Sequence, residues 1–182
     1  MLPHPQERVI RAACAADAPG IAAVHAKAWQ QAYDGIVPAS ILQSLTVEER
    51  TKMWVKAGLD DRPPDRPVLV AAVRDRIVGK TAGGPPRDRG MPFDAEIYAI
   101  NIDPACWRRG IGRGLFLRCA ETLATTGAGS LYLWVFVANL RARHFYESLA
   151  GVALDGHTRD VDMDGLPVPE IAYGWPEIPV PA

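Results

Sequence analysis

Hydrophobic residues in the first third of the chain recur with the period of an α-helix. Between residues 21 and 33, apolar and aromatic side chains stand three and four positions apart, and Asp17 precedes them where an N-cap would stand. A second helical stretch covers residues 41–45, and a third carries Trp54 behind a capping box that begins at Thr46. The pattern therefore predicts three helices before residue 60.

The rest of the chain alternates strands with helices. Runs rich in β-branched and aromatic residues predict strands at 9–11, 68–73, 77–82, 95–102, 130–137, 152–154 and 170–175. Helical patterns separate the later strands at 115–123 and 139–149, while 74–76 reads as a hairpin turn and 162–169 as a longer turn. We expect a mixed sheet with helices, an α+β fold in which the nearly continuous apolar run at 130–137 is a central strand.

Length and composition fit one soluble domain. The chain has 182 residues, of which 48% are hydrophobic and 23% charged, and no apolar run approaches the ~18–20 residues that cross a bilayer. We expect a single domain over residues 1–182, with loosely held ends at about 1–7 and 176–182. No secretory signal is visible at the N-terminus, which predicts a cytoplasmic protein that does not act at a membrane.

Charge and cysteine content exclude several classes of function. The 20 basic residues nearly balance the 21 acidic ones, which argues against a nucleic-acid-binding protein. The three cysteines, Cys14, Cys106 and Cys119, are odd in number and scattered, so they predict neither a disulfide framework nor a metal site. The four histidines show no metal-ligand spacing, and we expect no metal.

A glycine-rich loop follows the predicted strand at 95–102 and precedes a helix. Residues 109–114 read Arg-Gly-Ile-Gly-Arg-Gly, and the chain between 104 and 120 carries four arginines and no acid. Such a loop presents free N–H groups and a favourable helix dipole to an anion. It does not match a dinucleotide fingerprint, because Leu115 stands where the third glycine belongs, and no Gly-Lys-Ser/Thr follows as in a P-loop. On this pattern alone, a small anionic ligand, a plain turn and a solvated helix face all stay open.

Two longer motifs resemble those of the GNAT superfamily of N-acetyltransferases. Residues 102–115 resemble its motif A, and residues 133–146 resemble its motif B, including a spacing of seven between an asparagine and a tyrosine. The resemblance extends in order over nearly the whole chain. Trp107 departs from the family pattern, which usually has Arg or Gln there, and the sequence at 150–152 replaces the usual Gly-Phe.

The resemblance implies a fold and a cosubstrate. The fold would have α/β/α layers around a mostly antiparallel sheet whose fourth and fifth strands splay apart, and the pantetheine arm of acetyl-CoA would lie between them like an added strand. The backbone at 100–102 would pair with this arm, Asn139 would touch it, and the amides from 109 to 114 would hold the pyrophosphate. The full set implied in acetyl-CoA binding is Ile100, Asn101, Ile102, Arg108, Arg109, Gly110, Ile111, Gly112, Arg113, Gly114 and Asn139.

The implied chemistry is direct attack of a free amine on the thioester. A lysine-like amine has a pKa near 10.4, so only ~1 in 2500 molecules is neutral at pH 7 and a general base is useful. We expect Glu96 to be that base, because residues 96, 98, 100 and 102 share a face of a regular strand; a solvated strand residue is the alternative. Tyr146, whose family counterpart lies beside the sulfur, is expected to protonate the leaving thiolate; a core tyrosine is the alternative.

The acceptor side is less defined by the sequence. The resemblance implies that the first helix and the following loop line it, so we expect Trp29, Tyr33 and Tyr98 to contact the acceptor, with core packing as the alternative. We expect Arg141 and Arg143 to face solvent. The resemblance implies a small-molecule or peptide amine as acceptor, whose identity the sequence leaves open, and a homodimer is possible. The alternative function is a non-catalytic acyl-CoA-binding sensor or interaction module.

Overall fold

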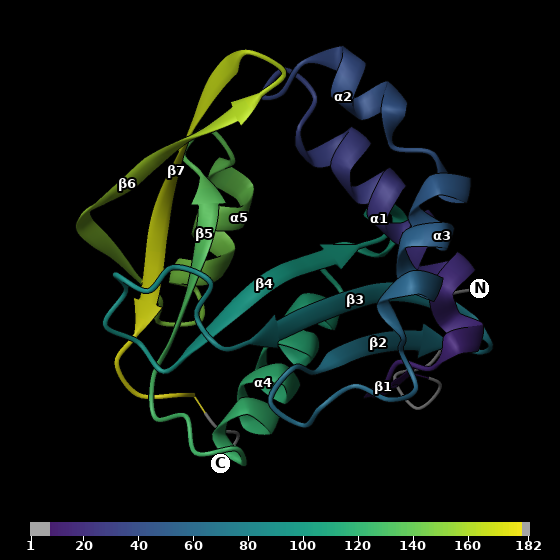
Figure 1. The fold of residues 1–182 in the computed structure, drawn as a ribbon, viewed down its shortest axis with the longest axis horizontal. Helices are drawn as coiled ribbons and strands as arrows, with labels where there is room; N and C mark the ends of the chain where they lie inside the picture. The colour runs from purple at the N-terminus through teal and green to yellow at the C-terminus, as the bar shows by residue number, and fades with distance from the viewer. Residues whose placement is uncertain (1–7, 180–182) are drawn as a thin grey trace.

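Seven strands form one sheet in the computed structural model, which describes residues 8–179. The strands are β1 (Arg8–Ala12), β2 (Val68–Val73), β3 (Arg76–Gly84), β4 (Ala95–Ile102), β5 (Leu131–Phe136), β6 (Val152–Met163) and β7 (Leu166–Trp175). The helices are α1 (Ala18–Ala32), α2 (Ala39–Ser44), α3 (Val47–Ala57), α4 (Ile111–Ala124) and α5 (Leu140–Glu147). The strand order is β1-β2-β3-β4-β5-β7-β6, and every neighbouring pair except β4 and β5 is antiparallel (Figure 1). This confirms the predicted mixed sheet with β5 in its interior.

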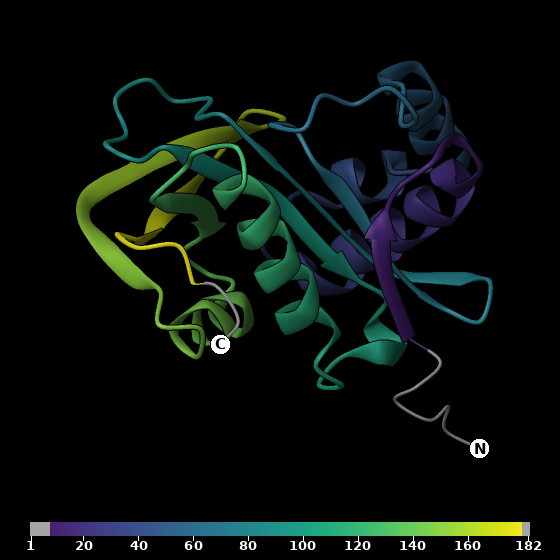
Figure 2. The ribbon, with the colours of Figure 1, turned by 90° about the horizontal axis from the view of Figure 1, so that it is seen from below.

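Helices cover both faces of the sheet. α1 and α3 pack on one face over β2–β4, and α4 packs on the other (Figures 1 and 2). The sequence explains the α4 side, because Leu115, Cys119 and Leu123 form the predicted apolar stripe and are at most 1% exposed. On the opposite face, Ile21 of α1 and Trp54 of α3 pack in a second core cluster. None of the helices in the described part of the chain is long and apolar enough to cross a membrane.

β4 and β5 pair only at their first residues. Ala95 lies opposite Leu131 and Glu96 opposite Tyr132, and the two strands share no further pairs. Beyond that point they diverge, as Figure 1 shows for the two arrows labelled β4 and β5. The predicted splay is therefore confirmed. It leaves the facing edges of both strands without a strand partner over most of their length.

A β-bulge in β4 overturns one prediction. The register passes from Ala99 opposite Ala82 to Ile97 opposite Gly83, so Tyr98 is an extra residue on its strand. Tyr98 packs in the cluster under α1 and α3, whereas Ile100 and Ile102 pack in the cluster under α4. The expectation that residues 96, 98, 100 and 102 share one face is thus wrong, because a bulge reverses the alternation of side chains.

The C-terminal part also departs from the sequence prediction. β6 and β7 are far longer than the runs at 152–154 and 170–175, and only residues 164 and 165 connect them. Most of β6 is exposed, so it carries no apolar alternation that could have revealed its length. Within the segment 176–182, for which a loose end is predicted, the Ile178 N–H donates to the Gly129 carbonyl at 2.9 Å. Residues 1–7 and 180–182 lie outside the described part of the chain.

Local signals at helix starts are partly confirmed. Thr46 caps α3 by accepting from the Glu49 N–H at 3.2 Å, as the capping box predicts. Asp17 precedes α1 but does not cap it with its side chain. Its carboxylate instead accepts from the Cys14 N–H at 2.9 Å and pairs with Arg11 at 2.6 Å, which fixes the turn before the helix.

Candidate active site

A cavity of about 550 Å³ opens where β4 and β5 separate. Its walls come from the last turns of α1, from β4 and β5, from the loop before α4 and from α5, with Met163 and Glu170 reaching it from the β6–β7 hairpin. Residues predicted from the sequence that line it are Trp29, Tyr33, Tyr98, Ile100, Asn101, Ile102, Arg108, Gly110, Ile111, Gly112, Arg113, Asn139 and Tyr146. The fold thus brings most of the predicted site to one cavity. Arg109, Gly114 and Glu96 do not line it.

The end of the cavity where the cofactor is expected, called the cofactor end below, is formed by residues 106–108 and 110–113 together with Arg141. Gly110 precedes α4 with a φ of +74°, a left-handed conformation that glycine adopts without strain. The first N–H groups of α4, from Ile111 to Arg113, have no intrahelical acceptor, and no other acceptor for them is found in residues 8–179. With Arg108 and Arg113 also lining this end, the site fits a phosphate-bearing ligand.

The remaining loop residues serve the fold. α4 begins at Ile111, so the glycine loop is shorter than predicted, and Gly114 lies inside the helix. A Cβ on Gly114 would stand 2.7 Å from the Cδ1 of Ile10, so this glycine allows α4 to pack on β1. The Arg109 carbonyl accepts from Nη1 of Arg8 at 3.0 Å, which ties the loop to the same strand.

Trp107 and Arg141 were missed as site residues. The Trp107 indole donates to the Ile102 carbonyl at 3.0 Å, and the Arg141 guanidinium stacks on its ring at 4.0 Å. Both residues line the cavity. Trp107 therefore forms part of the cavity wall even though it differs from the residue usual in the family. The prediction that Arg143 faces solvent is wrong, because it donates to the Tyr173 hydroxyl and the Val137 carbonyl, both at 3.2 Å.

Asn139 and Tyr146 meet the cavity from the two ends of α5. Asn139 caps the helix by accepting from the Ala142 N–H at 3.2 Å, as predicted. Tyr146 is buried, and its hydroxyl makes no hydrogen bond among residues 8–179. Burial, with a smaller contribution from Tyr33, raises the pKa of Tyr146. The phenol is therefore protonated at neutral pH and has no acceptor for its proton within the described chain.

Glu96 occupies a different place from the one predicted. Its carboxylate is only 1% exposed and accepts from the backbone N–H and Nε of Arg87, at 2.8 and 3.0 Å, and from the Tyr132 hydroxyl at 3.1 Å. Arg87 in turn stacks on Tyr98 at 4.5 Å. This carboxylate therefore ties the loop after β3 to the point where β4 and β5 still pair.

The acceptor end of the cavity is lined by aromatic rings and one carboxylate. This is the end where the acceptor is expected, and its residues are Trp29 of α1, Tyr33 at the C-cap of α1, Tyr98 of β4, Trp134 and Phe136 of β5, Met163 of β6 and Glu170 of β7. Tyr33 packs edge-on against Trp29, with ring centres 4.7 Å apart, and against Phe136 at 5.0 Å. Glu170 was not identified as a site residue from the sequence, because the local sequence does not show that β7 pairs with β5. The pairing of Glu170 with Phe136 brings Glu170 to the cavity.

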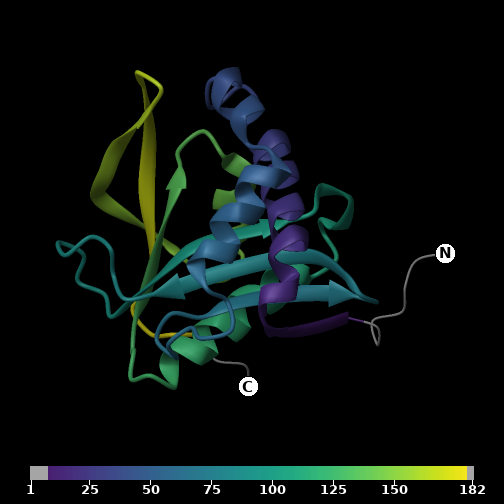
Figure 3. The ribbon, with the colours of Figure 1, turned by 45° about the vertical axis from the view of Figure 1, so that its right-hand side comes forward.

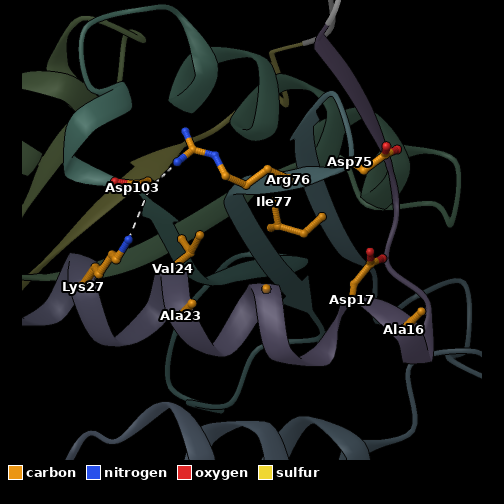
Figure 4. A pocket seen from close by; sticks show the side chains of 10 residues that line it. Ala16, Asp17, Ala23, Val24, Lys27, Asp75, Arg76, Ile77 and Asp103 are labelled. Atoms are coloured by element: carbon orange, nitrogen blue, oxygen red, sulfur yellow. Dashed lines mark ion pairs between the residues drawn. The ribbon is translucent and has the colours of Figure 1, made fainter.

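A second, smaller cavity of about 250 Å³ lies between α1 and the β2–β3 hairpin (Figure 4). Asp103 stands in it 3.9 Å from both Lys27 and Arg76, whose side chains are mostly exposed. It contains none of the predicted site residues. No group of three or more His, Cys, Asp or Glu that could hold a metal ion occurs within residues 8–179.

Comparison with known proteins identifies the family. The model of the acetyltransferase (GNAT) family matches residues 29–152. The chain is 30% identical over 172 residues to an uncharacterized N-acetyltransferase, YuaI, of Bacillus subtilis, covering 93% of each chain, and 29% identical over 167 residues to a probable N-acetyltransferase of Mycobacterium tuberculosis, covering 90% and 91%. Its fold matches that of a putative acetyltransferase from Salmonella typhimurium solved with acetyl-CoA, with a TM-score of 0.70, 17% identity and 95% of each chain covered. The chain therefore belongs to the GNAT family of acetyltransferases, which confirms the prediction of an acetyl-CoA-dependent N-acetyltransferase.

Proposed function

We propose that this N-acetyltransferase moves an acetyl group to a primary amine by direct attack in a ternary complex. The observation that carries the proposal is the continuity of the cavity. It joins unpaired amides and arginines at the cofactor end to an aromatic acceptor end, and the unpaired edge of β4 and Tyr146 lie between them. Both substrates can thus be held at once, with the reacting groups in the gap between β4 and β5.

The cofactor end supplies recognition of acetyl-CoA. The amides from Ile111 to Arg113 and the side chains of Arg108 and Arg113 would hold the pyrophosphate, and the free edge of β4 at 100–102 would pair with the pantetheine arm. Asn139, already fixed as the cap of α5, would touch the same arm. Acetyl-CoA brings the activated thioester, and the protein aligns it.

Tyr146 is proposed as the general acid. The amine nitrogen forms a bond to the acetyl carbon, the carbon–sulfur bond breaks, and the departing thiolate takes the Tyr146 hydroxyl proton, which solvent later restores. Burial raises the pKa of Tyr146, and it also disfavours a charged thiolate in the same gap. The first effect makes the phenol a weaker acid, and the second makes the thiolate a stronger base. Because they offset each other, burial does not prevent proton transfer from the phenol to the sulfur.

The proton lost by the amine needs a separate acceptor. Glu96, the predicted base, would take it only through water molecules or neighbouring side chains, since Arg87 and Tyr132 already hold its oxygens. We retain Glu96 as a proposal in that indirect role. A small-molecule or peptide amine as acceptor, a cytoplasmic location and a homodimer remain proposals alongside it.

The proposal is tested by release of free CoA from acetyl-CoA with a panel of primary amines. Turnover with at least one amine is expected, and acetyl-CoA and CoA, but not NADH, should raise the melting temperature. Binding of acetyl-CoA without turnover on any amine, α-amines and peptide N-termini included, would support a binding module instead. A rise with NADH alone would contradict the assignment of the glycine loop.

A further inference from the structure

Charged side chains are segregated along the cavity. Among the described residues that line it, the positive side chains are Arg108, Arg113 and Arg141, and all three belong to the cofactor end. The acceptor end has a single ionised side chain, Glu170, on β7. An anionic substrate would therefore be attracted to the cofactor end, and a cationic substrate to the acceptor end.

Glu170 is held in a position that leaves one oxygen available. Its partner on β5 is Phe136, and its side chain is 14% exposed. Nε and Nη2 of Arg159 both donate to Oε2, at 3.0 and 2.9 Å, whereas Oε1 has no partner among residues 8–179. The carboxylate is thus fixed by Arg159 and still has an oxygen free to accept a hydrogen bond from a ligand.

Aromatic rings surround this carboxylate. Tyr33 is close enough to Glu170 to be affected by its negative charge. Burial and this charge together raise the pKa of Tyr33 to about 12. The Arg159 guanidinium stacks on the Trp134 ring at 4.1 Å, although Arg159 itself does not line the cavity. Rings of this kind attract cations through their faces, and they do so more strongly where water is excluded.

The hairpin that carries Glu170 also closes the acceptor end from outside. β6 and β7 rise beside α2 and the last turn of α1 (Figure 3), and Ser40 of α2 donates to Asp164 at the hairpin tip at 3.0 Å. Met163 and Val168 of the hairpin pack with Leu42 and Phe136 in one cluster. The carboxylate therefore belongs to a built wall and is not a loose surface side chain.

We infer that Glu170 and the surrounding rings bind a cationic acceptor, an amine that carries no carboxylate next to its amino group. This inference rests on the proposed function, because it concerns the acceptor of the same reaction. The acceptor enters as an ammonium that donates to Oε1 of Glu170 while its apolar body packs on Trp29, Tyr33 and Phe136. It then loses one proton to solvent, and the neutral nitrogen attacks the thioester. A carboxylate on the acceptor would be repelled by Glu170, and the cation beside this carboxylate, Arg159, does not line the cavity and already donates to Oε2 of Glu170.

The competing explanation is that Glu170 only completes a cross-strand ion pair. Glu170 and Arg159 are register partners on β7 and β6, and such pairs stabilise a hairpin modestly. This explanation predicts the same outcome for loss of either partner. The inference predicts different outcomes, because of the two partners only Glu170 lines the cavity.

The experiment compares Glu170→Gln with the matched control Arg159→Leu, using acceptors that differ only by an α-carboxylate, such as phenethylamine against phenylalanine and cadaverine against lysine. The wild type is expected to show a KM at least ~10-fold lower for each amine than for its amino acid. Glu170→Gln should raise the KM for the amines ~10–100-fold, with a smaller change in kcat and unchanged affinity for acetyl-CoA. Arg159→Leu removes the group that positions Glu170 but leaves its charge, so the KM for all acceptors can rise while amines stay preferred over their amino acids. A loss of preference as complete as in Glu170→Gln would favour the cross-strand ion pair and overturn the inference.

Two further results would overturn the inference: a wild type that uses amino acids as well as the matching amines, or a folded Glu170→Gln protein with unaltered KM for amines. Calorimetry of the same acceptors against the protein–CoA complex gives the charge preference without turnover. Failure of every acceptor to be acetylated would therefore count against the proposed function, while the calorimetric preference still decides the role of Glu170.

Discussion

Replacing Tyr146 by Phe removes a single hydroxyl from the point where the two ends of the cavity meet. The hydroxyl has no hydrogen-bond partner among residues 8–179, so its loss leaves no donor or acceptor unsatisfied within them. Tyr146 lines the cavity, and its hydroxyl is not among the fully buried side-chain atoms that lack a partner in the described chain. The variant should therefore be as stable as the wild type or slightly more stable, by less than ~0.5 kcal/mol, which corresponds to a change in Tm below ~2 °C for a chain of this length.

The effect on turnover should be much larger. Loss of a general acid typically slows the chemical step ~10²–10⁴-fold, which is ~2.7–5.4 kcal/mol in the activation barrier. The affinity for acetyl-CoA should change little, because the amides of α4 and the edge of β4 are unaltered. The expected signature is thus a fall in kcat with an unchanged or raised Tm.

Steady-state release of CoA with a competent amine measures kcat. Melting curves without and with acetyl-CoA measure the Tm and the binding of acetyl-CoA. Tyr173→Phe is the matched control, because Tyr173 is fully buried but bonds Arg143 and Glu147 and does not line the cavity. That variant should lose stability and keep turnover. Near-normal kcat in Tyr146→Phe would refute the reasoning and transfer the acid role to water.

Three further predictions concern other parts of the site and the core. Gly112→Glu should abolish binding of acetyl-CoA in a folded protein, seen as loss of the ligand-induced rise in Tm, whereas Gly112→Ala should retain most of it; equal binding by both would make the loop a plain turn. Glu96→Gln should lower stability by ~1–3 kcal/mol in urea unfolding, because Arg87 loses a charged acceptor, and turnover slowed by a factor of ~100 or more would show that Glu96 also serves as the base. Burial lowers the pKa of Lys80 to about 8, so the native state binds this proton more weakly than the unfolded chain does and stability rises between pH 8 and 10.5. Lys80→Met should therefore be more stable than the wild type at pH 7 by up to ~3 kcal/mol, with the difference shrinking by pH 10.5 in urea titrations; a constant difference would contradict the reasoning.

The cofactor end could be predicted from the sequence because its chemistry is local. A glycine with positive φ, the first turn of a helix and a nearby arginine all lie within residues 108–113, so short-range spacing is sufficient to define the cradle. Asn139 and Tyr146 are similarly fixed, because they lie on one helix that starts with a recognisable cap. Even here the predicted glycine loop is too long, since Gly114 lies inside α4 and packs against β1.

Only part of the acceptor end, Trp29, Tyr33 and Tyr98, could be predicted from the sequence, because the rest is assembled by pairing between distant strands. The position of Glu170 depends on β7 lying beside β5, and the exposed strand β6 gave no periodic signal for the length of the hairpin. The bulge at Tyr98 is equally invisible in a run of alternating apolar residues. Prediction from spacing fails where register, which is a property of two strands, decides which face a side chain occupies.

The contrast between Glu96 and Glu170 follows from this difference. Glu96 lies on β4, which borders the splay, and Glu170 lies on β7, which pairs with the other edge of the splayed strand β5. Regular alternation along the strand favours Glu96 as a site residue. The fold surrounds Glu96 with Arg87 and Tyr132 at the one place where β4 and β5 still pair, so that carboxylate closes the base of the gap. Glu170 lies farther along, opposite Phe136, where the strands have separated and an oxygen can reach a ligand. A glutamate in the last β4–β5 pair thus has a structural position, whereas a glutamate opposite the separated end of β5 lines the cavity.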